Sequence, residues 1–127
     1  MGLITHIVIF KLHPTVSDAE RHLLASRFLA LQDRCELDGK KYLTVTGGKN
    51  NSKEGFEKGL EQAFVVTFET EKARDYYVDT DPAHNEFKEL VKDKVADLLV
   101  VDFEQGVFCS KRQEYQQKTL ACSGKDV

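Results

Sequence analysis

The stretch LITHIVIFKL, from Leu3 to Leu12, determines the fold class, because both of its faces are largely apolar when it is read as a strand. Successive side chains of a strand point to opposite faces of the sheet. One face carries Ile4, His6, Val8, Phe10 and Leu12, and the other carries Leu3, Ile7 and Ile9. The pattern predicts a sheet that is covered on both sides, and one cover could be a second subunit.

Three helices are expected outside this strand. The capping box Ser17-Asp18-Ala19-Glu20 marks the start of the first helix. A second helix is expected from Thr70 to about Val78, and Asp81 and Pro82 suit the N-cap and first position of a third. The expected buried stripes are Leu24, Phe28, Leu31 and Cys35 in the first helix, and Phe87, Leu90, Val91 and Val95 in the third.

Three further strands are predicted, over 40–46, 62–68 and 97–103. Gly47-Gly48 is expected to begin a turn, and 53–61 a loop. The order of strand, helix, strand, strand, broken helix and strand predicts an α+β, ferredoxin-like fold, a four-stranded antiparallel sheet with helices on one face. Its other face would be bare and apolar, which predicts a homodimer in which two sheets close against each other as a dimeric α+β barrel.

Composition narrows the class of protein. The chain has 127 residues, 41% of them hydrophobic and 31% charged, and a formal net charge of -3. This profile is typical of a soluble globular domain. A negative net charge argues against nucleic acid as a partner, and no apolar run is long enough to span a membrane.

The domain is predicted to occupy residues 1–106, because the apolar periodicity fades after Gly106. Residues 107–127 are expected to form a polar C-terminal tail, either disordered or a short docking helix. The three cysteines, Cys35, Cys109 and Cys122, show no metal-ligand spacing, so reduced thiols and a cytoplasmic location are the expectation.

The stretch YYVDTDPAHNEFKEL, residues 76–90, raises the question of what His84 does behind Asp-Pro-Ala. An imidazole in an apolar pocket could act as a base near neutral pH. The structural alternative is a partly exposed histidine that bonds a neighbouring carbonyl. The four histidines show no metal-binding spacing, so neither a metal nor a cofactor is predicted.

Several stretches together resemble the stress-responsive A/B barrel family, also called Dabb (dimeric α+β barrel). They are THIVIFKL, GKN, FVVTFET, YYVDTDPAHNEF and LLVVDFE, in this order from Leu3 to about Glu104. The resemblance implies a ferredoxin-like fold and a homodimer with a shared barrel. It implies no single function, because some members are known mainly as stable stress-induced proteins, whereas a polyketide cyclase of the family performs an aldol condensation.

The cyclase's site residues carry over position by position. Its proposed base matches His84, the tyrosine partner matches Tyr77 and the first-strand histidine matches His6. Phe28 stands where the cyclase has a tyrosine and Gln62 where it has a histidine, and Phe87 completes the set expected to bind substrate. The leading hypothesis is a cofactor-independent site for a small hydrophobic carbonyl compound, with His84 as base and Tyr77 as hydrogen-bond donor. The alternative is a non-enzymatic, stress-responsive homodimer whose pocket is filled by its own side chains.

Overall fold

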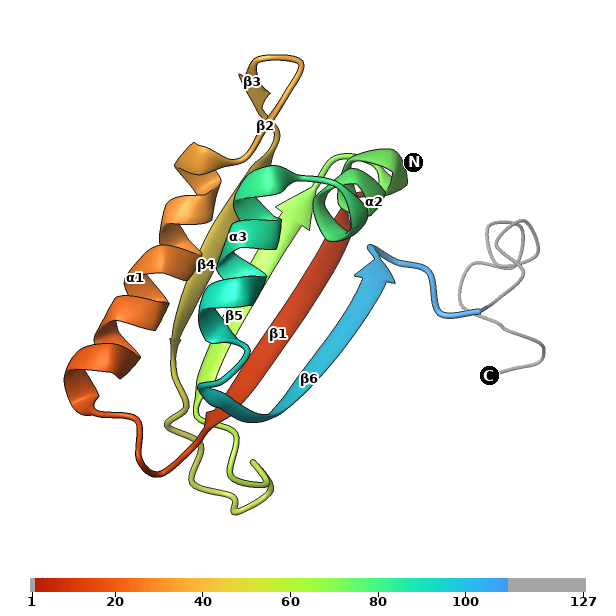
Figure 1. Ribbon diagram of the computed structural model, residues 1–127. Coiled ribbons are helices and arrows are strands. Elements are labelled where there is room, and N and C mark those ends of the chain that lie inside the picture. Colours follow the sequence, from red (N-terminus) through yellow and green to blue (C-terminus); the bar gives the residue numbers. More distant parts are fainter. Residues whose placement is uncertain (1, 110–127) are drawn as a thin grey trace.

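The computed structural model describes residues 2–109 and places four strands in one antiparallel sheet of order β4-β5-β1-β6 (Figure 1). All three helices lie on the same face of this sheet, so the predicted ferredoxin-like fold is confirmed. The elements, in chain order, are β1 (Ile4–Leu12), α1 (Asp18–Arg34), β2 (Glu36–Leu37), β3 (Lys40–Lys41), β4 (Leu43–Lys49), β5 (Gln62–Phe68), α2 (Glu71–Asp79), α3 (Pro82–Val91) and β6 (Val95–Glu104).

Local capping signals fix where the helices begin. Ser17 and Glu20 form the reciprocal capping box of α1, which satisfies two backbone N–H groups at that end. The Thr70 side chain accepts from the Ala73 N–H at the start of α2. Asp81 is the N-cap of α3, directly before Pro82. The three predicted helix starts are therefore confirmed.

The core lies between the sheet and the helices. The predicted inward face of β1 is buried, and so is the predicted stripe of α1. Its centre is aromatic: the rings of Phe28 and Phe64 stack with centroids 4.1 Å apart, and Phe87 meets Phe28 edge-on at 5.1 Å. Stacked and edge-to-face rings of this kind stabilise a core beyond their buried area.

The opposite face of the sheet is apolar and bears no helix. Leu99, Val101 and Phe103 of β6 are each nearly half exposed there. Ile7 and Ile9 of β1 pair with Val101 and Leu99 and belong to the same face. These five residues are called the outer apolar face below.

Strand β6 is an edge strand that the helices leave open, as its position in Figure 1 shows. Leu98 and Val100 point to the helix side of the sheet, since they pair with the buried Phe10 and Val8, yet both remain nearly half exposed. Strand β6 is therefore apolar and accessible on both of its faces. An open apolar edge of this length invites pairing with another chain.

Two local expectations were wrong. Gly47 and Gly48 lie inside β4 and do not form a turn, because the strand continues in register with Phe64 and Ala63 of β5. A short hairpin, β2 and β3, was missed, although Asp38-Gly39 between them is a strong hairpin signal. Both turn residues have positive φ, 55° and 77°, which Gly and Asp tolerate better than most residues.

The cysteines differ in their state. Cys35 is a free, buried thiol, as predicted, whereas Cys109 is disulfide-bonded, so the expected reduced state is wrong for that residue. Cys122 and residues 110–127 of the predicted tail lie outside the described residues. None of the helices within residues 2–109 has the length and apolar character needed to cross a membrane.

Candidate functional site

Tyr77 of α2 is the centre of a group of aromatic side chains between the helices and the sheet. Its side chain is completely buried. The imidazole of His84 stacks on its ring, with centroids 3.7 Å apart and planes 12° from parallel. On another side the imidazole of His6 meets it edge-on at 5.7 Å, and Phe68 packs at 5.2 Å. Three of the predicted site residues, His6, Tyr77 and His84, are thus brought together.

His84 is held in one orientation by the chain around it. It lies in the first turn of α3, and its Nδ1 is 2.7 Å from the backbone carbonyl oxygen of Tyr77. A carbonyl oxygen can only accept a hydrogen bond, so Nδ1 carries the proton in the neutral ring. The lone pair of neutral His84 is therefore on Nε2. His84 combines features of the two alternatives predicted for it. It is partly buried among aromatic side chains, and it also bonds a neighbouring carbonyl.

Burial lowers the pKa of His84 from 6.5 to about 4, and the nearby charges of Lys88 and His6 act in the same direction. The hydrogen bond to Tyr77 and the charge of Asp81 oppose this shift only in part. His84 is therefore neutral at any pH near 7 and offers an unprotonated Nε2.

This pKa makes the stability of the protein depend on pH. The unfolded chain binds the His84 proton more tightly than the folded chain, so stability falls as the pH drops from 6.5 towards 4. Between pH 7 and pH 4.5 we expect a loss of about 2–3 kcal/mol from this group. His84→Gln should lack that loss in urea unfolding at the two pH values. His22→Gln, which changes an exposed histidine, should keep it; equal pH dependence in all three proteins would contradict the buried neutral state.

Asp81 fixes the start of the helix that carries His84. Its carboxylate is almost fully buried and accepts hydrogen bonds from the Ala83 N–H at 2.9 Å and the Tyr42 hydroxyl at 2.6 Å. One oxygen caps the helix and the other binds the side chain that precedes β4. Burial and the bond to Asp81 raise the pKa of Tyr42, so this phenol stays a donor.

His6 belongs to a chain of charged groups that the sequence did not predict. Its Nδ1 is 2.7 Å from Oδ1 of Asp102, and Oδ2 of Asp102 accepts from Arg74 at 2.9 Å. Asp102 lies directly opposite His6 on β6. The carboxylate holds a proton on Nδ1 and leaves Nε2 turned away from Asp102. The sequence did contain a sign of this contact. Asp102 is an acidic residue inside the apolar run LLVVDFE, and the alternation of the strand assigns it to the inner face.

The Tyr77 hydroxyl is buried and has no hydrogen-bond partner among residues 2–109. Burial raises its pKa, with smaller contributions from Cys35 and Asp81 nearby, so the group stays protonated. A buried donor without a partner costs about 1–3 kcal/mol. Such a group calls for an explanation, and one explanation is a bound molecule that accepts its hydrogen bond.

The other predicted site residues lie elsewhere. Phe28 and Phe87 are buried in the aromatic core and contact each other. Gln62 lies at the start of β5, opposite Phe10 and away from the Tyr77 group, and its Nε2 donates to the backbone carbonyl of Arg21 at 3.1 Å. The substrate-binding set expected from the sequence is therefore divided between two ends of the sheet.

The part of the chain that the structure describes holds no group of three or more His, Cys, Asp or Glu side chains suited to a metal ion. The polar groups around Tyr77 are instead two imidazoles, one phenol and one carboxylate–guanidinium pair. Such groups can take up a proton, donate a hydrogen bond and stabilise a developing negative charge.

Solved structures share the fold. A protein of Arabidopsis thaliana has a TM-score of 0.73 at 24% identity, covering 83% of this chain and 97% of that one. Hydroxynitrile lyase from Passiflora edulis also has a TM-score of 0.73, at 15% identity, covering 84% and 97%. A dimeric ferredoxin-like protein of unknown function from Jannaschia sp. has a TM-score of 0.63 at 24% identity, covering 81% and 99%.

At these identities the likeness concerns the fold alone. No curated protein is significantly similar to the chain in sequence. The family model described as the stress responsive A/B barrel domain matches residues 4–105, which is most of the chain. The protein therefore belongs to the stress-responsive A/B barrel domain (Dabb) family.

Proposed function

We propose that the group around Tyr77 binds a small, mostly hydrophobic carbonyl compound and transfers a proton without a cofactor. The observation that carries this proposal is the buried, unpartnered Tyr77 hydroxyl beside two imidazoles whose Nδ1 atoms are already bound. Both imidazoles keep Nε2 for a ligand. The chemistry we favour is aldol-type ring closure of a linear poly-β-ketone, as in a polyketide cyclase.

The proposed reaction starts at a carbon between two carbonyl groups, whose proton is acidic enough for a positioned imidazole to remove. The proton moves to Nε2 of His84, and the electron pair of the C–H bond forms an enolate. The enolate carbon attacks a second carbonyl carbon of the same molecule, forming a C–C bond and an alkoxide. The alkoxide then takes the proton back from His84, so the base is regenerated.

The low pKa of His84 leaves the ring ready to accept a proton, but it also disfavours the protonated ring that forms when the proton arrives. The ring is unprotonated near pH 7, but burial makes its protonated form unfavourable. An enolate forming beside the ring would offset this cost, because an opposite charge nearby favours the charged form of the imidazole. Tyr77 supplies a neutral donor for the oxygen that gains charge, and His6, held by Asp102 and Arg74, orients the ligand.

A second candidate function is a stress-responsive homodimer without turnover. It is favoured by the completely buried Tyr77 and by Phe28, which fills its position with a stacked ring. In that case the pocket of the cyclase-like proteins is occupied here by side chains, and the buried hydroxyl is a tolerated cost.

A ligand screen separates the two candidates. Linear β-diketones and β-triketones, at a hundredfold excess over their dissociation constants, should stabilise the protein by about 2.7 kcal/mol. The measurement is the thermal unfolding midpoint with and without ligand. Tyr77→Phe should lose this stabilisation because the donor is gone, whereas Tyr76→Phe, a matched change one residue away, should retain it. A midpoint that none of these compounds shifts would favour the non-enzymatic candidate.

The homodimer is part of both candidates. The outer apolar face and the open strand β6 are the surfaces that a second copy would cover. We propose a two-fold arrangement in which these surfaces meet, so that the two sheets enclose a shared barrel. A domain ending near residue 106 and a cytoplasmic location remain predictions.

A further inference from the structure

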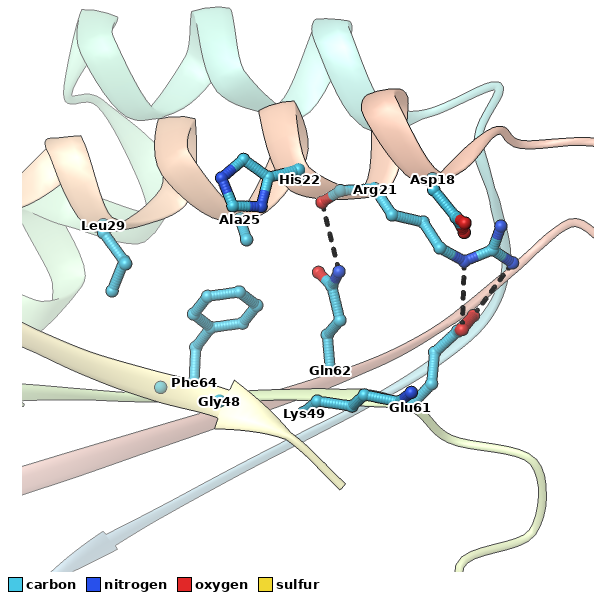
Figure 2. A pocket seen from close by; sticks show the side chains of 11 residues that line it. Asp18, Arg21, His22, Ala25, Leu29, Gly48, Lys49, Glu61, Gln62 and Phe64 are labelled. Atoms are coloured by element: carbon cyan, nitrogen blue, oxygen red, sulfur yellow. Dashed lines mark hydrogen bonds and ion pairs between the residues drawn. The ribbon is translucent and has the colours of Figure 1, made fainter. Parts of the chain in front are cut away.

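A hollow that does not include the Tyr77 group lies between α1, from Asp18 to Leu29, and the adjoining ends of β4 and β5 (Figure 2). Its volume is about 440 Å³, within the range of small-molecule sites. Gln62 lines it and pairs with Phe10, four positions along β1 from His6. At about 3.4 Å per residue this is roughly 14 Å.

Gly47 creates the hollow. It lies inside β4, two residues before the strand ends at Lys49, and directly opposite Phe64, where a side chain would fill the space below α1. A Cβ at this position would lie 2.5 Å from Cδ2 of Phe64 and 2.6 Å from the carbonyl oxygen of Ala63. Glycine therefore lets the Phe64 ring form the floor of the hollow, where Figure 2 shows it below α1. Ala25 and Leu29 of α1 add apolar surface above it.

Charged groups close one end of the hollow and balance one another. Nε of Arg21 is 3.2 Å from Oε1 of Glu61, and a second guanidinium nitrogen is 3.3 Å from Oε2. Oε2 of Glu61 also accepts from the Leu12 N–H at 3.1 Å. The four charged residues of the lining are Asp18 and Glu61, which are negative, and Arg21 and Lys49, which are positive. The lining has no net charge, which favours an uncharged ligand.

Gln62 provides the one polar atom in the hollow that needs a partner. Its Nε2 donates to the Arg21 carbonyl, and because a carbonyl only accepts, this bond fixes which end of the amide is oxygen. Oε1 is buried and has no hydrogen-bond partner among residues 2–109. Figure 2 shows this oxygen on the side of the amide that faces Phe64. It requires a donor, such as a hydroxyl group.

We propose that this hollow binds a small neutral alcohol or phenol. The ligand hydroxyl donates to Oε1 of Gln62, and the apolar body packs against Phe64, Ala25 and Leu29. The site needs neither His84 nor Tyr77, so it holds whether or not the Tyr77 group is catalytic.

The test uses two probes that differ in one hydrogen-bond donor, 4-ethylphenol and 4-ethylanisole, in NMR titrations of the ¹⁵N-labelled full-length protein. In the natural protein, 4-ethylphenol should shift the Gln62 side-chain amide and the backbone amides of Gly47 and Gly48. 4-Ethylanisole should bind at least tenfold more weakly, because its oxygen cannot donate. This comparison requires no variant.

Gln62→Met preserves the length of the side chain but removes the acceptor, and it should weaken 4-ethylphenol at least tenfold. Gln105→Met is the matched control, because it makes the same change at an exposed glutamine outside the lining, beyond the opposite end of the sheet, and it should bind as the natural protein does. Equal affinity for the two probes, undiminished binding by Gln62→Met, or shifts that centre on Tyr77 and His84 would each overturn the proposal.

Discussion

A Val101→Asp protein should be a monomer at concentrations at which the natural protein is a dimer. Val101 is in the middle of the outer apolar face, between Leu99 and Phe103 on β6, and is 47% exposed in the single chain. A two-fold contact through this face would bury both copies of the new carboxylate without a partner. An uncompensated buried charge costs about 3–5 kcal/mol, so association should weaken by at least about a thousandfold.

The measurement is the molar mass from light scattering over a range of protein concentrations. Ser26→Asp is the control, because Ser26 is an exposed residue of α1, which lies on the opposite side of the sheet. It should leave the dimer unchanged. A natural protein that is monomeric at high concentration, or a Val101→Asp protein that stays dimeric, would contradict the proposed contact. Circular dichroism of both variants tests whether the subunit itself remains folded.

Much of this fold follows from signals that act over a few residues. The capping box at Ser17, the N-cap and proline at Asp81 and Pro82, and the alternation in β1 each specify one element without help from the rest of the chain. Because these local signals agree on one order of elements, the ferredoxin-like fold could be predicted. The Asp38-Gly39 hairpin was equally local and could have been found in the same way.

The features that were missed depend on residues far apart in the sequence. Asp102 meets His6 only because β6 pairs with β1 in one register, across 96 positions of sequence. Gly47 continues a strand, although a glycine pair usually indicates a turn, because the packing of Phe64 on the next strand requires a residue without a side chain. Gln62 was assigned to the same site as His84 by resemblance, but its strand position places it at the other end of the sheet. Register and packing decide such contacts, and neither can be predicted from local spacing.

Turnover should depend strongly on His84. If the Tyr77 group closes the ring of a poly-β-ketone, His84→Ala should lower kcat by about a hundredfold to ten-thousandfold, the usual contribution of a general base. The reason is geometric, since the Tyr77 carbonyl holds Nδ1 and leaves only Nε2 to accept the proton. The assay follows conversion of a linear β-triketone to its ring-closed product, with the spontaneous rate subtracted. Dimer mass and circular dichroism should be unchanged.

His22→Ala is the matched control, because it removes an exposed imidazole from α1, and its kcat should equal that of the natural protein. Unchanged turnover in His84→Ala would eliminate His84 as the base and leave His6 as the other imidazole in contact with Tyr77. The same assay on Asp102→Asn then distinguishes the two rings. Asparagine keeps the size of the side chain but removes the charge that faces Nδ1 of His6, so kcat should fall steeply only if His6 accepts the proton. A catalytic His84 predicts the opposite order, with a much larger loss in His84→Ala than in Asp102→Asn.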